Sequence, residues 1–233
     1  MKKNILITGT DFGLGFSLAC RYLQEGWVVH ALNRKIGSRL EDIKKFHKKD
    51  LFVYFADITR EEEIKAAFDS ISIKTPSLDI LINNAGIHLD RNKLDIDNLN
   101  YQNIETMYSV NTIGPLRVVQ HALPFIKNGL QKLIVNISSE AGSIGDCWRD
   151  REYGYCMSKA ALNMMTRILQ NRLKNDNIKV LAIHPGWLKT DMGGPDATDN
   201  PDDAALQIYQ TLSHQWNIPD PFFIRRDGEP MHW

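Results

Sequence analysis

Residues 4–15, with the sequence NILITGTDFGLG, decide the fold that this chain is expected to adopt. Ile5, Leu6 and Ile7 predict a buried strand, and a helical pattern begins at Leu14 directly after the glycine-rich turn. Glycine permits a tight turn, and the N–H groups at the start of a helix bind phosphate groups. The spacing is GxxxGxG and not GxGxxG, so the loop alone is weak evidence. It predicts a strand–turn–helix unit that binds a dinucleotide.

The rest of the chain alternates between short apolar runs and longer helical patterns. Strands are predicted at residues 4–7, 27–32, 51–55, 78–82, 132–137 and 179–183, with an edge strand at 222–224. Helices are predicted at residues 14–24, 38–47, 104–125 and 154–173, with two more that follow caps at Thr59 and Asn200 and reach about residues 71 and 212. The strand runs are apolar throughout, which is typical of strands buried on both faces of a parallel sheet.

This order of elements predicts an α/β fold, a single doubly wound Rossmann-type domain with a central parallel sheet of about seven strands flanked by helices. The domain would cover residues 1–233, with a cofactor half at about 1–130 and a catalytic and substrate half at about 131–233. In such sheets, ligands bind beyond the carboxyl ends of the strands.

The composition narrows the classes of protein. Lys and Arg together number 28, and so do Asp and Glu, so no nucleic-acid or membrane partner is predicted. Cys20, Cys147 and Cys156 are widely spaced, which indicates a reducing compartment and predicts a cytoplasmic protein. The histidines are scattered, so no metal site is predicted.

Cofactor preference depends on the residues that follow the second predicted strand. Asn33 and Arg34 stand where a carboxylate would bind the ribose hydroxyls of NAD. A guanidinium suits the 2′-phosphate of NADP, whereas Asp11 and Phe12 place a carboxylate and no cation in the neighbouring loop. The sequence favours NADP over NAD, and the alternative is that Arg34 is a solvated loop residue.

Tyr155 and Lys159 are four residues apart in a predicted helix, so both face one side of it. Lowering a tyrosine pKa from near 10 to neutrality requires roughly 4 kcal/mol. An ammonium at about 4 Å supplies about that much at an effective dielectric constant near 20. The pair is therefore a candidate acid/base, although this spacing on its own is usually surface decoration.

Further polar residues lie where strands end. Ser138 and Ser139 follow a buried run, and a hydroxyl there could donate a hydrogen bond to a carbonyl oxygen. Residues 83–86, Asn-Asn-Ala-Gly, leave another strand with small side chains where a ligand comes close. Asn111 is unfavourable inside a helix, and with Pro115 it predicts a kink that holds a water. The alternative is a core asparagine whose amide is satisfied.

Together these motifs resemble the short-chain dehydrogenase/reductase family, in the family's order and over nearly the whole chain. The matching set is Thr8-Gly9-xxx-Gly13-x-Gly15, Asp57, Asn83-Asn84-Ala85-Gly86, Asn111, Ser139, Tyr155-xxx-Lys159 and Pro185-Gly186. Residues 136–144, 158–163 and 184–195 are similar to the C-factor and sniffer-like carbonyl reductase branch, which often has Asn and a basic residue in place of Asp11 and Phe12. The resemblance implies an NAD(P)-dependent oxidoreductase that transfers hydride between nicotinamide and a carbonyl or alcohol.

The resemblance also implies roles for single residues. Tyr155 would be the general acid in reduction and the base in oxidation, Lys159 would lower its pKa and bind the nicotinamide ribose, Ser139 would orient the carbonyl, and Asn111 would hold a water. The predicted cofactor-binding residues are Gly9, Asp11, Gly13, Leu14, Gly15, Asn33, Arg34, Asp57, Ile58, Asn83, Ala85, Gly86, Tyr155, Lys159, Pro185, Gly186 and Thr190.

Two other functions stay open. One is a cofactor-binding signalling or scaffold protein with little turnover, and the other is a ketoreductase for carrier-bound acyl chains. The second would need a basic docking patch, for which Arg149, Arg151 and Lys189 are the candidates, and nearby carboxylates weaken it. Substrate identity is expected to lie in residues 143–153 and 187–200. Trp148, Arg149 and Trp187 are candidate pocket residues there, and the alternative is that the tryptophans pack in the core. Residues 191–201 are expected to be mobile. The resemblance favours a homodimer or homotetramer.

Overall fold

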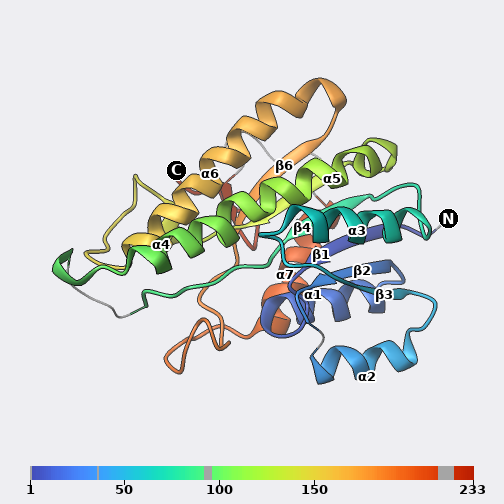
Figure 1. Ribbon diagram of the computed structural model, residues 1–233, viewed down its shortest axis with the longest axis horizontal. Helices are drawn as coiled ribbons and strands as arrows, with labels where there is room; N and C mark the ends of the chain where they lie inside the picture. The colour runs from blue at the N-terminus through green and yellow to red at the C-terminus, as the bar shows by residue number, and fades with distance from the viewer. Residues whose placement is uncertain (1, 36, 92–95, 215–222) are drawn as a thin grey trace.

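A computed structural model describes residues 2–35, 37–91, 96–214 and 223–233, and it contains one parallel sheet between two layers of helices (Figure 1). Within the described residues the strand order is β3-β2-β1-β4-β5-β6-β7. The strands are β1 Asn4–Thr8, β2 Val28–Asn33, β3 Leu51–Phe55, β4 Ile80–Asn83, β5 Leu133–Ile137, β6 Lys179–His184 and β7 Phe223–Arg225. The predicted Rossmann-type fold is confirmed. Phe222, the first residue of the predicted edge strand, lies outside the described residues.

Helices cover both faces of the sheet. They are α1 Gly13–Gln24, α2 Ser38–Phe46, α3 Glu61–Ser72, α4 Tyr101–Tyr108, α5 Gly114–Asn128, α6 Tyr153–Leu173 and α7 Pro201–His214, with short turns η1 Ile96–Asn98, η2 Ser109–Ile113, η3 Glu140–Gly142 and η4 Lys174–Asp176. One core cluster joins the sheet to α1, α2 and α7, and the other joins it to α3, α5 and α6. Figure 1 shows these two groups of helices on opposite sides of the strands. None of the described helices combines the length and the apolar character needed to cross a bilayer.

The central strands are buried on both faces because their side chains alternate between the two cores. Ile5 and Ile7 of β1 belong to the core beneath α1 and α7, whereas Leu6 belongs to the core beneath α3 and α5. The chain runs from β1 outward to β2 and β3 and then returns to β4 on the other side of β1. This switch in strand order opens a crevice at the carboxyl ends of the strands.

The helix predicted at residues 104–125 is wrong in one respect, because the π-helical turn η2 divides it into α4 and α5. Pro115 has no N–H group, so it cannot complete the α-helical hydrogen bond to the carbonyl of Asn111. The Asn111 amide instead donates to the Ile87 carbonyl at 2.9 Å and to Ser158 Oγ at 3.0 Å. The sequence predicted the disturbance but not its form.

The cap predicted at Thr59 is also wrong. Helix α3 begins at Glu61 after Arg60, and Arg60 makes no capping bond. The Thr59 N–H and hydroxyl both donate to Asp57 Oδ1, at 2.9 and 2.7 Å. The Thr59 hydroxyl, which was predicted to cap the helix, is therefore bonded to the Asp57 carboxylate instead.

Candidate active site

A cavity of about 790 Å³ lies at the carboxyl ends of the strands. Each of the first six strands is followed by residues that line it, among them Gly9, Arg34, Asp57, Gly86, Ser139 and Pro185. The predicted site residues all line this cavity except Asn33, Asn83 and Asn111, which are buried. One cavity therefore brings together residues that are far apart in the sequence.

The glycine-rich loop is closely packed and leaves little room for side chains. Gly9 has a φ of +71°, and a Cβ there would lie 2.9 Å from the Cα of Ala85. A Cβ on Gly15 would overlap the Gly9 carbonyl and the Asn84 amide. Helix α1 begins after Phe12, whose side chain makes no capping bond, and Gly13, Leu14 and Gly15 line the cavity. The loop therefore fits a dinucleotide pyrophosphate, which would accept hydrogen bonds from the uncapped end of α1.

Two asparagines hold the loop in place. Asn33 Oδ1 accepts hydrogen bonds from the N–H of Thr10 at 2.6 Å and from its hydroxyl at 3.2 Å. Asn84 Nδ2 donates to the carbonyls of Thr8 and Gly9 at 3.0 and 2.9 Å. In this arrangement the Asn33 amide supports the glycine loop from below. Asn83, which donates to Asn136 Oδ1 at 2.9 Å, likewise lies beneath the cavity wall.

Opposite charges meet at the end of the cavity beside β2 and β3. Arg34 and Lys35 are exposed and line this end, as do Asp11 and Asp57. Burial raises the pKa of Asp11, although a hydrogen bond from the Gly37 N–H and the two cations act against it. Burial also opposes ionisation of Asp57, but the Thr59 hydrogen bonds and the nearby arginines outweigh it and lower its pKa. Lys35 is a cation that the sequence reasoning missed, although it directly follows Arg34.

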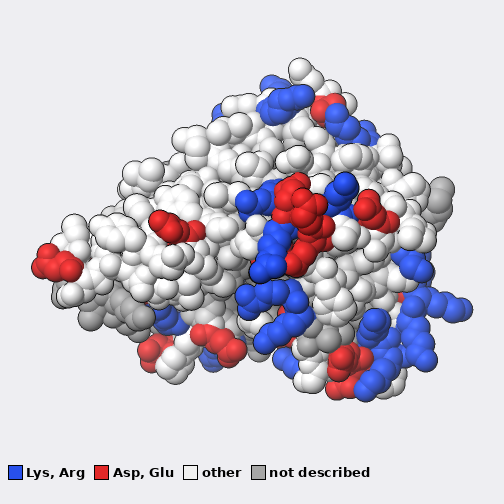
Figure 2. Space-filling model, viewed as in Figure 1, with Lys and Arg blue, Asp and Glu red and all other residues white. Residues whose placement is uncertain are grey.

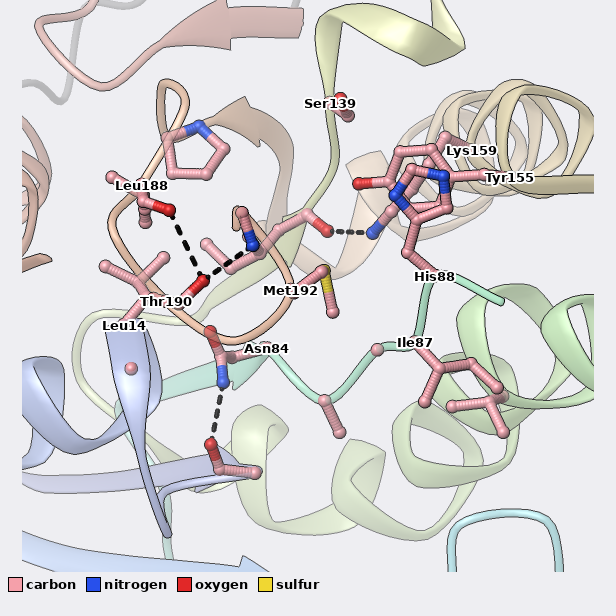
Figure 3. A pocket seen from close by; sticks show the side chains of 18 of the residues that line it. Leu14, Asn84, Ile87, His88, Ser139, Tyr155, Lys159, Leu188, Thr190 and Met192 are labelled. Atoms are coloured by element: carbon pink, nitrogen blue, oxygen red, sulfur yellow. Dashed lines mark hydrogen bonds between the residues drawn. The ribbon is translucent and has the colours of Figure 1, made fainter. Parts of the chain in front are cut away.

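Tyr155 lies in the first turn of α6, half-buried, with its hydroxyl in the cavity (Figure 3). Burial raises its pKa to about 12, and the nearby Ser139 hydroxyl opposes this rise. Lys159, one turn further along, is buried and donates to the Ile137 carbonyl at 2.8 Å. Its Nζ lies 5.8 Å from the centroid of the Tyr155 ring, and burial lowers its pKa to about 8. Burial is the largest influence on the Tyr155 pKa in the protein alone, and the lowering of this pKa by Lys159 stays a prediction.

His88 and Asp90, which the sequence reasoning missed, lie beside Tyr155. The His88 and Tyr155 rings stack with centroids 4.0 Å apart, as Figure 3 shows. Asp90 Oδ2 accepts a hydrogen bond from the Gly154 N–H at 2.7 Å. Neither residue belongs to a motif, and the only available signal was that both follow the Asn-Asn-Ala-Gly segment at the end of β4.

The outer part of the cavity is lined by two tryptophans and by Arg149, which is paired with two carboxylates. Trp148 and Trp187 line the cavity and are 78% and 48% exposed, so neither is a core residue. Arg149 donates to Glu140 Oε1 at 2.6 Å and forms an ion pair with Glu152. Because both of its carboxylate partners lie in the same loop region, Arg149 does not offer a free cation to a carrier protein.

The loop after β6, residues 187–199, returns on itself above the cavity. Trp187 Nε1 donates to the Gly193 carbonyl at 2.8 Å, and the N–H of Lys189 donates to the Asp199 carbonyl at 2.8 Å. Thr190 Oγ1 accepts a hydrogen bond from the Gly193 N–H at 3.0 Å. These bonds hold Thr190 toward the cavity, and the expected mobility of residues 191–201 stays a prediction.

Comparison with known proteins agrees with this geometry. The family described as short chain dehydrogenase matches residues 3–201. The C-signal protein of Myxococcus xanthus is 36% identical over 54% of this chain and 75% of its own length. The carbonyl reductase Sniffer of D. melanogaster is 30% identical with a TM-score of 0.92, and all of both chains is covered. The carbonyl reductase from chicken fatty liver, solved with bound NADPH, is 33% identical with a TM-score of 0.89 over 100% of this chain and 99% of that one.

Proposed function

Because the chain belongs to the short-chain dehydrogenase family and is an NAD(P)-dependent oxidoreductase, we propose that it reduces a carbonyl compound and that Tyr155 protonates the carbonyl oxygen. The observation that carries the proposal is that Ser139, Tyr155 and Lys159 line the same cavity as the glycine loop. The signalling and acyl-carrier alternatives are not favoured by these comparisons.

Two side chains of this chain, those of Ser139 and Tyr155, would act on the substrate oxygen. The bound nicotinamide supplies the hydride. Ser139 Oγ donates a hydrogen bond to the carbonyl oxygen as negative charge develops on it. Tyr155 transfers its phenolic proton to the same oxygen. Its raised pKa means that the phenol keeps its proton at neutral pH, which suits an acid in the direction of reduction.

Lys159 and Asn111 would support this proton transfer. We expect the Lys159 ammonium to bind the nicotinamide ribose and to stabilise the tyrosinate that forms. The Asn111 side chain is committed to Ile87 and Ser158, so the water of the proton relay would bind the Asn111 backbone carbonyl, which Pro115 leaves without its α-helical donor.

The test is Tyr155→Phe, which removes only the hydroxyl. We expect turnover to fall by about 100- to 10,000-fold, which is the contribution of a positioned general acid. NADPH binding, measured by thermal shift, should stay close to that of the wild type. Oxidation of NADPH is followed with a panel of aldehydes, ketones and quinones, and full activity of the variant would falsify the role of Tyr155.

We propose NADP as the preferred cofactor. Arg34 and Lys35 line the end of the cavity where a 2′-phosphate would lie, and the carbonyl reductase from chicken fatty liver binds NADPH. Asp11 and Asp57 at the same end limit the preference, and NAD remains the alternative.

We also propose that the two halves of the domain have different functions. Residues 1–130 would bind the adenosine and phosphate groups, and residues 131–233 would supply Ser139, Tyr155 and the substrate loops.

We propose a homodimer or homotetramer that assembles through α5 and α6, where Leu116, Met164 and Ile168 are 44%, 62% and 59% exposed. Figure 2 shows few charged side chains over the part of this face formed by α4 and α6. Light scattering after size exclusion measures the assembly. A cytoplasmic location, which cell fractionation would test, fits the three free cysteines.

A further inference from the structure

Residues 87–90 form a short strap that crosses from β4 to the start of α6. The Asn111 side chain bonds both backbone groups of Ile87, the first residue of the strap. Asn111 Oδ1 accepts from the Ile87 N–H at 2.8 Å, and Asn111 Nδ2 donates to the Ile87 carbonyl at 2.9 Å. The N–H of Leu89 points to Met107 Sδ at 3.3 Å. The strap backbone is therefore held against η2 and α4 before it reaches Tyr155.

His88 lies flat against the catalytic tyrosine. The two ring planes are 19° apart with centroids at 4.0 Å, and the His88 side chain is only 10% exposed. His88 Nε2 lies 3.4 Å from Asp90 Oδ1 and 3.7 Å from Glu152 Oε1, so two carboxylates lie close to the same ring nitrogen. A stacked ring of this kind restricts the rotation of the Tyr155 phenol about its χ angles.

Asp90 supplies the cap of the catalytic helix. The residue at the N-cap position, Glu152, has a left-handed backbone with φ 63° and makes no capping bond. Asp90 Oδ2 accepts instead from the N–H groups of Gly154 and Tyr155, at 2.7 and 3.3 Å. A carboxylate at a helix N-terminus satisfies free N–H groups and interacts favourably with the helix dipole. The first turn of α6, which carries Tyr155, is thus tied to the strap by a side chain about sixty-five residues away in sequence.

We propose that His88 and Asp90 are positioning residues that fix the orientation of the Tyr155 phenol toward the substrate carbonyl. The inference rests on the proposed function, in which Tyr155 is the proton donor. A displacement of about 1 Å at a reacting group can cost on the order of 100-fold in rate, so two contacts on the ring and on its own backbone N–H are sufficient to control turnover.

The cap is tested with Asp90→Ala, Asp90→Asn and the matched variant Asn100→Ala. Asn100 caps α4, which carries no catalytic residue, by accepting from the Asn103 N–H at 3.0 Å. Losing either cap should lower the melting temperature by about 2 to 4 °C. We expect only Asp90→Ala to lower kcat as well, by about 10- to 100-fold, with the KM for NADPH changed less than about threefold. Asp90→Asn keeps an acceptor oxygen and should recover most of kcat.

The stacking is tested with His88→Ala and His88→Phe. Phenylalanine keeps a flat ring and should retain kcat within about threefold, whereas alanine should lose about tenfold or more. The orientation of the phenol is measured independently of activity by ¹⁹F NMR of protein labelled with 3-fluorotyrosine, in which Tyr155→Phe identifies the Tyr155 signal. Loss of the ring current should move that signal in His88→Ala and much less in His88→Phe.

The outcomes separate the two proposals. If the wild type oxidises NADPH with no carbonyl in the panel, the proposed function fails, and the NMR signal still reports whether His88 orients Tyr155. The positioning role is overturned if Asp90→Ala keeps wild-type kcat, if Asn100→Ala loses as much kcat as Asp90→Ala, or if the Tyr155 signal is unchanged in His88→Ala.

Discussion

Lys159 is a buried cation whose ammonium is bonded to the carbonyl of Ile137. Burial lowers its pKa to about 8, so the ammonium predominates below that pH and is lost as the pH rises through it. If the charge binds the nicotinamide ribose and stabilises the tyrosinate, kcat/KM for reduction should fall above about pH 8. A pH profile of kcat/KM reports groups of the free enzyme and is the measurement that checks this. Lys159→Arg, which keeps its charge, should shift the fall to higher pH or remove it, and an unchanged profile would show that another group causes it.

Arg34 and Lys35 are expected to increase the affinity of the cavity for the 2′-phosphate of NADPH. Charged hydrogen bonds contribute about 1.5–3 kcal/mol, or roughly 10- to 100-fold in affinity. The double variant Arg34→Ala/Lys35→Ala should therefore raise the dissociation constant for NADPH by about tenfold or more while that for NADH changes little. Lys44→Ala/Lys45→Ala, on the exposed side of α2, is a matched control for the loss of two charges. Equal losses for both cofactors in the Arg34 variant would contradict the preference for NADP.

The sequence could predict which residues lie at the carboxyl ends of the strands. Because carboxyl ends of parallel strands meet at one edge, the sequence correctly gathered Ser139, Tyr155 and the glycine loop. It could not tell which side chains point into the cavity. Asn33 and Asn83 turn to neighbouring polar groups beneath it, whereas His88 and Asp90, which belong to no motif, reach α6 across the fold.

At the scale of single elements, the turn between β1 and α1 depends on the absence of a Cβ at Gly15. A methyl group there would overlap the Gly9 carbonyl and the Asn84 amide. Gly15→Ala should lower the free energy of unfolding by about 1–3 kcal/mol and abolish the thermal shift caused by NADPH. Gly26→Ala is the control, because Gly26 has a φ of +79° but open space around it. It should lose about 1–2 kcal/mol through backbone strain and keep its response to NADPH. A normal NADPH shift in Gly15→Ala would show that the loop adapts.

Elements were predictable to the extent that local patterns determine them. Strand β3 was predicted at its observed bounds because its apolar run begins directly after Asp50 and ends shortly before Asp57. The split of residues 104–125 into α4, η2 and α5 depends on Ile87 and Ser158, which contact Asn111 from other parts of the chain. Hydrophobic periodicity carries no information about such partners, so only the disturbance at Asn111 and Pro115 could be expected.

At the scale of the whole molecule, the residues after β7 support the loop that covers the cavity. Arg226 donates to the Pro185 carbonyl at 3.0 Å and forms an ion pair with Asp199 at 3.0 Å. Because the pair is partly exposed, its contribution is about 1 kcal/mol, or roughly fivefold in affinity. Arg226→Met should weaken NADPH binding by about that factor, measured by titration. Arg225→Met, its exposed neighbour at the end of β7, should have little effect, and equal effects would assign the loss to charge and not to the loop.

The overall topology followed from sequence because strand and helix signals alternate from end to end and crossovers between parallel strands are right-handed. The long-range ties could not be predicted. The bond from the Gly145 N–H to the Trp233 carbonyl, like that from Arg226 to Pro185, joins segments whose spacing in sequence says nothing about their distance in space.

The π-helical turn η2 has a consequence for how this chain can change during evolution. A π turn contains one residue more than an α turn, so η2 is equivalent to a single inserted residue. Deleting one residue from η2 would restore a regular helix and change the directions in which the remaining side chains of residues 109–113 point. Asn111 would then lose its bonds to Ile87 and Ser158 together. We therefore expect aligned relatives to differ in length at surface loops but to show no single-residue gap between residues 101 and 128.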